Sequence, residues 1–359
     1  MNKTDRKING EIELYRFLFC LAVLFFHAEK YFLGEPSSLG GFKPYFFVHG
    51  SVGVEFFFVC SGFFMAKSVR KKCDEELSKL GTDTISFMRH KVRSIAPVHI
   101  FFWVLSFMSL VIARSWDAGT AVKKLADSVP SFFLVQMFGF KGTSPNHVTW
   151  YLSVMLISMF IIYPFLRKHY DVFAKVAAPV LGMFILGHLY LKYGSLTGVM
   201  VMDGIFYKSM LRGFAEILIG ICTYEAAEYV RSLKPGRLKS IMFTVISILL
   251  IIGSFIYIMH TLPARYEFIM VFVSAVLLII AYSEQSLLSG TLNNRFTVLL
   301  GELTLPLYLS QVTVINLTGR FGTDLSFAAK TCALAAGCAA LSVITVLFQK
   351  KLMSSRLDK

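Results

Sequence analysis

Long apolar stretches separated by short polar segments recur along the whole chain. An α-helix needs about 20 predominantly apolar residues to cross the hydrocarbon core of a bilayer. The pattern therefore predicts an all-α integral membrane protein, a bundle of about ten transmembrane helices. We expect the spans at about 12–32, 46–68, 95–113, 148–166, 172–191, 209–228, 240–260, 267–283, 299–317 and 327–348.

The segments between the spans set the expected topology. Ten spans put both termini on one side, and Lys and Arg gather next to those span ends that would share this side, which predicts that both termini are cytoplasmic. The stretch ISFMRHKVR, 85–93, mixes apolar and basic residues as an interfacial helix does. The stretch SFFLVQMFGF, 131–140, is too short to span and is expected to be re-entrant or interfacial. No soluble domain is evident, so residues 1–359 are expected to form a single transmembrane domain.

Composition supports this class. Hydrophobic residues make up 55% of the chain and charged residues only 16%, whereas a soluble domain has about a quarter charged residues. The net charge of +14 lies mainly in loops beside apolar spans, where it sets topology and meets anionic lipid, so nucleic acid is not an expected partner. The six cysteines show no metal-type spacing, and no metal site is expected. The expected location is the cell membrane, as a multi-pass protein of a bacterial inner or cytoplasmic membrane.

The first apolar stretch carries two residues that suggest chemistry, Arg16 and His27. Eleven residues are about three helical turns, so both side chains lie on one face, roughly 16 Å apart along the axis. A charge at the centre of a lipid-facing helix costs about 2.5–3.5 kcal/mol. Each residue alone could be interfacial, but the shared face favours a protein-lined interior. Histidine is also the side chain best suited to move a proton near neutral pH.

Further polar residues lie in other spans. Glu55 stands among Val54 and three phenylalanines, which suggests either a buried ion pair or a carboxylate that orients the imidazole of His27. Arg212 and Glu216 are four residues apart and are expected to form an intrahelical ion pair.

Several motifs carry a family resemblance. The stretch LYRFLFCLAVLFFH is similar to the Arg-x10-His signature of the family-3 membrane acyltransferases, and GSVGVEFFFVCSGFFMAKS resembles their next signature, with Glu55 as the acid. TWYLSVML, LRGFAEILIG and LLGELTLPLYLSQ resemble later segments in the same order, so the resemblance covers nearly the whole chain.

This resemblance implies a fold and an activity. Family members are multispanning enzymes of about ten spans that move an acyl group, usually acetyl, from a cytoplasmic acyl-CoA-type donor to a carbohydrate or similar acceptor. It implies an integral-membrane O-acyltransferase that uses acetyl-CoA or another acyl-CoA and acts on an extracytoplasmic glycan or glycolipid. By resemblance, His27 is the catalytic histidine and Arg16 its motif partner. Glu55 is a further catalytic candidate because it could hold the imidazole in the right tautomer.

The chain departs from the family pattern at several positions. The stretch RHKVRSIAPVHI holds a basic cluster without the family's strict Arg-x-x-Arg spacing before a proline, and Arg89, Lys91 and Arg93 are its candidates for binding donor phosphates. Other departures stand at Ser94, His99, Met155 and Gln311.

Two other function classes are open. A transporter or flippase of a lipid-linked glycan could also place polar residues inside a bundle, although such proteins usually show paired repeats and broken helices, which are not evident in this chain. A structural subunit of an envelope-assembly complex would not need the buried Arg, His and Glu residues.

Overall fold

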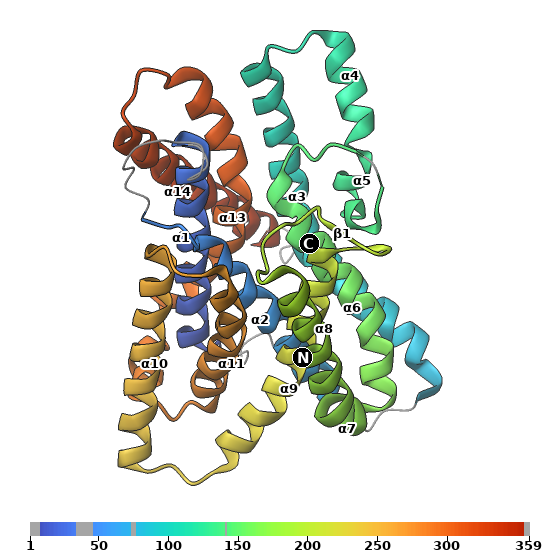
Figure 1. The fold of residues 1–359 in the computed structure, drawn as a ribbon, viewed down its shortest axis with the longest axis vertical. Coiled ribbons are helices and arrows are strands. Elements are labelled where there is room, and N and C mark those ends of the chain that lie inside the picture. Colours follow the sequence, from blue (N-terminus) through green and yellow to red (C-terminus); the bar gives the residue numbers. More distant parts are fainter. Residues whose placement is uncertain (1–7, 34–45, 73–76, 141, 355–359) are drawn as a thin grey trace.

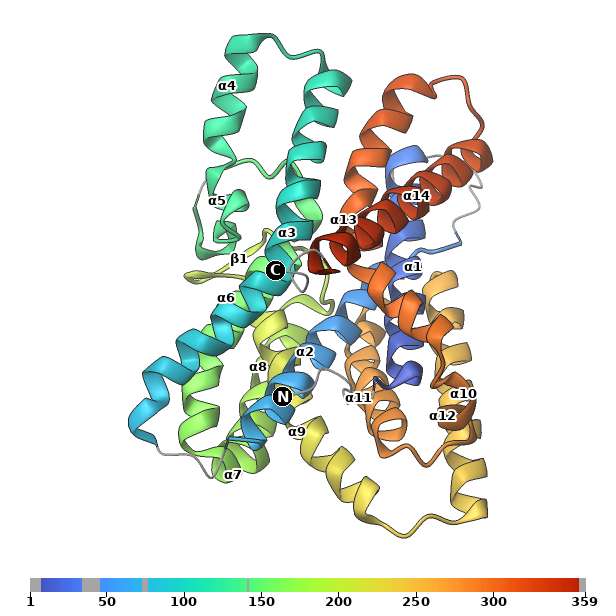
Figure 2. The ribbon, with the colours of Figure 1, turned by 180° about the vertical axis from the view of Figure 1, so that it is seen from behind.

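The computed structural model describes residues 8–33, 46–72, 77–140 and 142–354, and these form almost entirely helices (Figures 1 and 2). The long helices among them are α1 (Gly10–Phe32), α2 (Gly53–Arg70), α3 (Leu80–Arg114), α6 (Trp150–Lys168), α8 (Ala178–Tyr193), α9 (Lys208–Ser232), α10 (Arg237–Met259), α11 (Glu267–Ser283), α13 (Arg295–Phe321) and α14 (Phe327–Ser354). The short elements are α4 (Ala118–Asp127), α5 (Val129–Phe132), α7 (Tyr170–Val172), α12 (Leu287–Leu292) and the hairpin β1 (Met202–Asp203) and β2 (Phe206–Tyr207). The expected all-α class is confirmed.

Eight helices in the described part of the chain are long and apolar enough to cross a membrane. Helices α1 and α9 are 23 and 25 residues long but are not among the eight. Both carry acidic and basic side chains, several of which are buried, such as Glu11, Arg212 and Glu216. Their charges face the inside of the bundle, and for this reason hydropathy alone underrates them. The count of ten spans stays a prediction.

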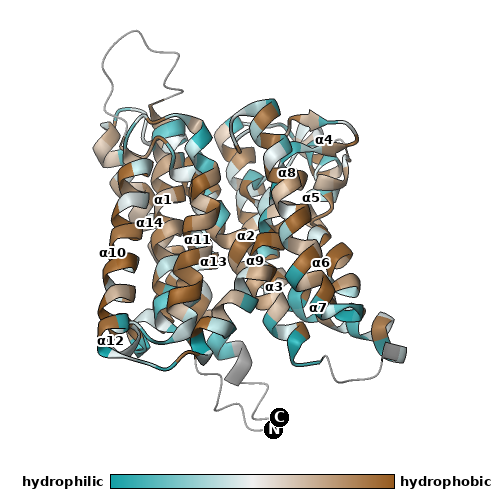
Figure 3. Ribbon diagram, turned by 60° about the horizontal axis from the view of Figure 1, so that its bottom comes forward, coloured by the Kyte–Doolittle hydropathy of each residue, from teal (hydrophilic) through white to brown (hydrophobic). Residues whose placement is uncertain are grey.

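The two ends of the bundle can be distinguished by where α1 begins. We call this end, drawn at the bottom of Figure 3, the lower end, and the opposite one the upper end. The backbone N–H of Gly10 donates to Asn293 Oδ1 at 2.8 Å, which places the start of α1 beside the start of α13. Lys350 near the end of α14 pairs with Glu302 of α13 at 2.7 Å. The first and last described helices therefore meet the same end, as an even number of crossings requires. The termini themselves lie outside the described residues.

Lipid-facing and buried helices differ in how much of their apolar surface is covered. In the stretch containing α2, 78% of an 18-residue apolar segment is buried inside the protein, but in α10 the corresponding share is only 22%. Large apolar side chains on the outer helices are exposed, for example Phe184 on α8 and Leu249 on α10. Figure 3 shows such hydrophobic residues along α10, above its hydrophilic lower end. An apolar surface of this kind is stable in lipid, which fits a multi-pass membrane protein.

Two glycines bring α2 and α9 together at the centre of the bundle. A Cβ on Gly62 would lie 2.0 Å from the carbonyl oxygen of Ile217, and one on Gly220 would lie 2.1 Å from that of Val59. Only glycine allows backbones this close, which is how membrane helices gain packing without a hydrophobic driving force between them.

The expected interfacial helix at 85–93 is wrong as a separate element. Helix α3 runs without interruption from Leu80 to Arg114 and includes Pro97. The basic residues therefore lie on the lower part of a long, continuous helix. The stretch 131–140 does not span, as expected, and forms the end of α5 and a short 3₁₀ turn at Gln136–Phe138.

Candidate active site

A cavity of about 960 Å³ extends from the lower end toward the middle of the bundle. Its wall on this side follows α2 from Phe57 to Ser68, eleven residue steps or about 17 Å of helix at 1.5 Å per residue, and continues to Lys71 just past the helix end. Helices α1, α3, α6, α9, α11 and α13 supply the other walls. A volume of this size suits a cofactor-sized ligand.

Arg16 lines this cavity and is held by a carboxylate on its own helix. Arg16 Nη1 donates to Glu13 Oε2 at 2.6 Å, and the two side chains are 30% and 14% exposed. Glu13 is backed by Gly301 of α13, where a Cβ would lie 1.9 Å from Glu13 Oε2. The pair is thus pressed into a fixed position. Sequence reasoning missed Glu13, although its spacing of three residues from Arg16 was a usable signal.

The three basic candidates on α3 divide between two faces. Lys91 lines the cavity with its Nζ 5.8 Å from the centroid of the Phe87 ring. Arg89 and Arg93 are exposed and are not part of the cavity wall. On α3 the cavity wall includes Phe87, Lys91 and Ser94, which are three or four residues apart and share one face of the helix. Arg89 and Arg93 are each two residues from Lys91, so their side chains point to other faces. The structure therefore brings only Lys91 of this cluster to the cavity.

His27 lies three turns above Arg16, near the upper end, and is half-buried. Its Nδ1 is 2.7 Å from Gln311 Oε1, while Gln311 Nε2 donates to the carbonyl oxygen of Tyr308 at 2.7 Å. A carbonyl can only accept, so the amide NH₂ of Gln311 faces Tyr308 and its oxygen faces His27. The hydrogen bond from His27 then needs a proton on Nδ1, which leaves Nε2 as the basic nitrogen.

A second histidine flanks His27. The rings of His27 and His147 are perpendicular, with centroids 5.8 Å apart. His147 Nε2 is 3.0 Å from the hydroxyl of Tyr31, which is 46% exposed. In the described part of the chain, His27 Nε2 has no hydrogen-bond partner and is not among the enclosed polar atoms. This nitrogen is therefore available to a molecule that approaches from the upper end.

Three aromatic rings lie together in the wall of the cavity, and one of them, Tyr308, is linked to His27 through Gln311. Phe57, Tyr151 and Tyr308 line the inner end of the cavity, and their centroids lie 5.9, 6.2 and 6.0 Å apart pairwise. His27 is not part of the cavity wall. Arg16 and His27 occupy one helix at the predicted spacing, but the structure does not bring them into one continuous space.

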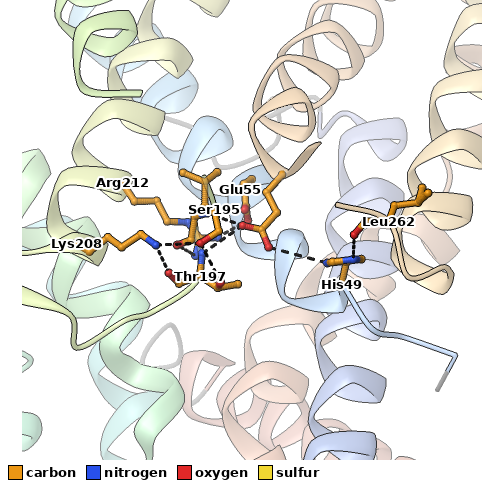
Figure 4. A network of polar contacts seen from close by, with 9 residues as sticks. His49, Glu55, Ser195, Thr197, Lys208, Arg212 and Leu262 are labelled. Atoms are coloured by element: carbon orange, nitrogen blue, oxygen red, sulfur yellow. Dashed lines mark hydrogen bonds and ion pairs between the residues drawn. The ribbon is translucent and has the colours of Figure 1, made fainter. Parts of the chain in front are cut away.

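Glu55 forms a buried ion pair with Arg212 (Figure 4), and in the described part of the chain no hydrogen bond joins it to His27. Arg212 also donates through Nε to Glu216 Oε1 at 3.1 Å, as expected for the intrahelical pair. All three side chains are 3% exposed or less. Of the two interpretations of Glu55, the ion pair is confirmed. The expectation that it orients the imidazole is wrong, because Gln311 occupies that position.

The same network ties the upper loops to the bundle. Glu267 at the start of α11 accepts hydrogen bonds from the backbone N–H groups of Leu196 and Thr197 at 2.5 and 3.2 Å. Lys208 at the start of α9 donates to Ser195 Oγ at 3.2 Å and to the Thr197 carbonyl (Figure 4). These contacts explain why charged groups tolerate burial here: each has a partner. The network is structural support beside the site.

Other departures from the family pattern have structural partners. His99 Nε2 is 3.0 Å from the carbonyl oxygen of Phe132, which anchors α5 to α3. Met155 lines the cavity and accepts from Ser61 Oγ at 3.3 Å. Among the described residues, no group of three or more His, Cys, Asp or Glu side chains is placed to hold a metal ion.

Comparison with known proteins agrees with these features. No curated protein and no solved structure matches the chain. A family model described as an acyltransferase domain, the acyltransferase 3 model, matches residues 9–348 and so covers nearly the whole chain, including the cavity, the Arg16–Glu13 pair and His27. The protein therefore belongs to the acyltransferase 3 family and is an acyltransferase.

Proposed function

We propose that this protein is an O-acyltransferase of the cell membrane that moves an acetyl group from acetyl-CoA to a hydroxyl of an extracytoplasmic glycan or glycolipid. The whole chain would form one catalytic domain. The observation that carries the proposal is α1, which presents Arg16 to a cavity at the lower end and His27 to the upper end. One helix thus joins a donor side to an acceptor side.

The lower end suits the donor. Arg16, Lys67, Lys71, Lys91 and Arg231 all line the cavity and outnumber its glutamates, which are Glu13, Glu228 and Glu284. Arg and Lys are the residues that bind phosphate. The helix ends there also carry the basic residues that the positive-inside rule assigns to the cytoplasm, where acyl-CoA is found. In this proposal Arg16, which is held by Glu13, contacts the thioester arm of the donor.

The upper end suits the acceptor. With Nδ1 of His27 committed to Gln311, Nε2 can accept the proton of an acceptor hydroxyl. The acceptor oxygen attacks the thioester carbonyl carbon and a C–O bond forms. The C–S bond then breaks, and the CoA sulfur leaves with the proton that the imidazolium returns. His147 and Tyr31 lie beside this nitrogen and would position the acceptor.

The two sides must connect during transfer. Arg16 and His27 are about 16 Å apart along the helix, so they cannot act on the same atom. In this proposal the thioester arm passes between Phe57, Tyr151 and Tyr308 to reach His27. The transporter or flippase alternative has less support, because the chain belongs to an acyltransferase family.

The test is acyl transfer by the reconstituted full-length protein. Radiolabelled acetyl-CoA is supplied on the lower-end side of proteoliposomes that contain extracted cell-envelope glycans. We expect labelled glycan with the wild type and none with His27→Ala. His169→Ala, an exposed histidine at the lower end of α6, is the matched control and should transfer normally. Transfer that persists in folded His27→Ala would refute the role of His27. Transport of glycan without labelling would favour the alternative.

A further inference from the structure

A tyrosine with two cations against its ring stands at the lower end of the cavity. Lys67 Nζ lies 4.6 Å from the ring centroid of Tyr282, and the guanidinium carbon of Arg231 lies 5.2 Å from the same centroid. The three residues come from the lower ends of α2, α11 and α9, and all of them line the cavity. We call Lys67, Arg231 and Tyr282 the cationic clamp.

In the part of the chain that the structure describes, the two cations of the clamp are not held by direct ion pairs. Among the described residues, neither Lys67 nor Arg231 forms an ion pair with a carboxylate. The acid within the cluster, Glu228, instead accepts hydrogen bonds from Tyr282 at 2.7 Å and from Tyr224 at 2.9 Å. The tyrosines thus hold the carboxylate in place, and the two cations, which both line the cavity, have no salt bridge within the described segments that a ligand would have to break. The deeper Arg16 differs, because Glu13 already neutralises it.

The position of the clamp also points to a ligand. Basic residues at this end are common for reasons of topology alone. Lys168 and Arg237 are such residues: they lie at the lower ends of α6 and α10, are exposed, and do not line the cavity. Lys67, which is half-buried, and Arg231, which is exposed, both line the cavity wall instead. Along α2, Lys67 lies ten residues below Phe57 at the inner end, about 15 Å of helix.

We propose that the cationic clamp binds the phosphates of the nucleotide end of acyl-CoA, so that the pantetheine arm runs up the cavity toward Arg16. The inference rests on the proposed function and adds to it a residue-level site for the nucleotide. Of the three residues that the sequence suggests for this role, Arg89 and Arg93 face away from the cavity, and Lys91 lines it. Charge-assisted hydrogen bonds from Lys and Arg to phosphate are strong, and an aromatic ring that stabilises both cations holds them in place.

Binding of three related ligands tests the clamp without knowledge of the acceptor. The full-length protein is purified in nanodiscs of neutral phosphatidylcholine and titrated with CoA, dephospho-CoA and pantetheine. The variants are Lys67→Gln, Arg231→Gln and the double variant, with Lys168→Gln and Arg237→Gln as matched controls. We expect each single variant to weaken CoA binding by about tenfold, and the double variant by more. Pantetheine lacks phosphates, so its affinity should be the same in all proteins.

Each other outcome has a distinct meaning. CoA affinity that is unchanged in the double variant overturns the clamp and leaves the proposed function standing. An equal loss of pantetheine affinity also overturns it, since the damage would then be general. A wild type that binds no CoA overturns both proposals.

An anionic lipid headgroup offers the same phosphate chemistry, and nanodiscs containing phosphatidylglycerol separate the two sources. If the variants change only the response to phosphatidylglycerol and not CoA binding in neutral discs, the clamp holds lipid and the proposal is wrong.

Discussion

Gln311 provides the sharpest test of how His27 works. Its side chain is fully buried and joins two groups: it accepts from His27 and donates to the Tyr308 carbonyl, both at 2.7 Å. Replacement by leucine keeps the approximate volume and removes both hydrogen bonds. His27 Nδ1–H then loses its acceptor, and the imidazole is free to rotate or to change tautomer. We therefore regard Gln311 as a positioning residue.

The size of the effect follows from the lost hydrogen bond. Leaving a buried donor without a partner costs about 1–3 kcal/mol. If this cost appears in the transition state, kcat falls by about 5- to 150-fold, since 1.36 kcal/mol corresponds to tenfold in rate. This is less than the full loss expected for His27→Ala. The KM for acetyl-CoA should not change, because the donor cavity lies below the three aromatic rings.

The assay is steady-state acyl transfer with three variants. Gln311→Leu should lower kcat alone. Gln311→His should recover most of the activity, because one ring nitrogen can accept from His27 while the other donates to Tyr308. Thr313→Val, on the same helix as Gln311, is the structural control: it removes a buried hydrogen bond of 2.9 Å to Ser106 of α3 and does not touch His27. Wild-type kcat in Gln311→Leu, or an equal loss in Thr313→Val, would refute the positioning role.

Two further predictions concern stability. Arg212→Gln should lower the stability of the detergent-purified protein by about 3–5 kcal/mol, because it leaves the buried carboxylates of Glu55 and Glu216 without their cation. Glu302→Gln removes an exposed ion pair and should cost at most about 1 kcal/mol, and equal melting temperatures of the two variants would contradict the argument. Gly62→Ala should separate α2 from α9, since its Cβ would meet a backbone carbonyl, and lower the melting temperature. Gly187→Ala, which has nothing within 4 Å, should melt like the wild type, and a Gly62→Ala variant that does the same would disprove the close approach.

The sequence predicted the lone polar residues better than their partners. The spacing of Arg16 and His27 along one helix is local, and helix geometry alone gives it. The partner of His27 lies 284 residues away on α13, and the pattern of apolar residues does not encode that distance. For the same reason the sequence leaves Glu55 with two possible roles, a buried ion pair or a partner of His27, and only the fold identifies its partner as Arg212, 157 residues away.

The sequence by itself determined that this chain is a bundle of membrane helices, that its basic residues gather at one end, and that α1 carries a histidine and an arginine on one face. These properties depend on composition and on the period of a helix, and both are local. Only the tertiary structure decided which polar groups meet. It placed Lys91, Lys67 and Arg231 around one cavity, turned Arg89 and Arg93 away from it, and linked His27 through Gln311 to Tyr308 in the cavity wall. Such choices depend on how each helix is rotated and on close approaches such as that at Gly62, and these are set by packing between helices far apart in the chain.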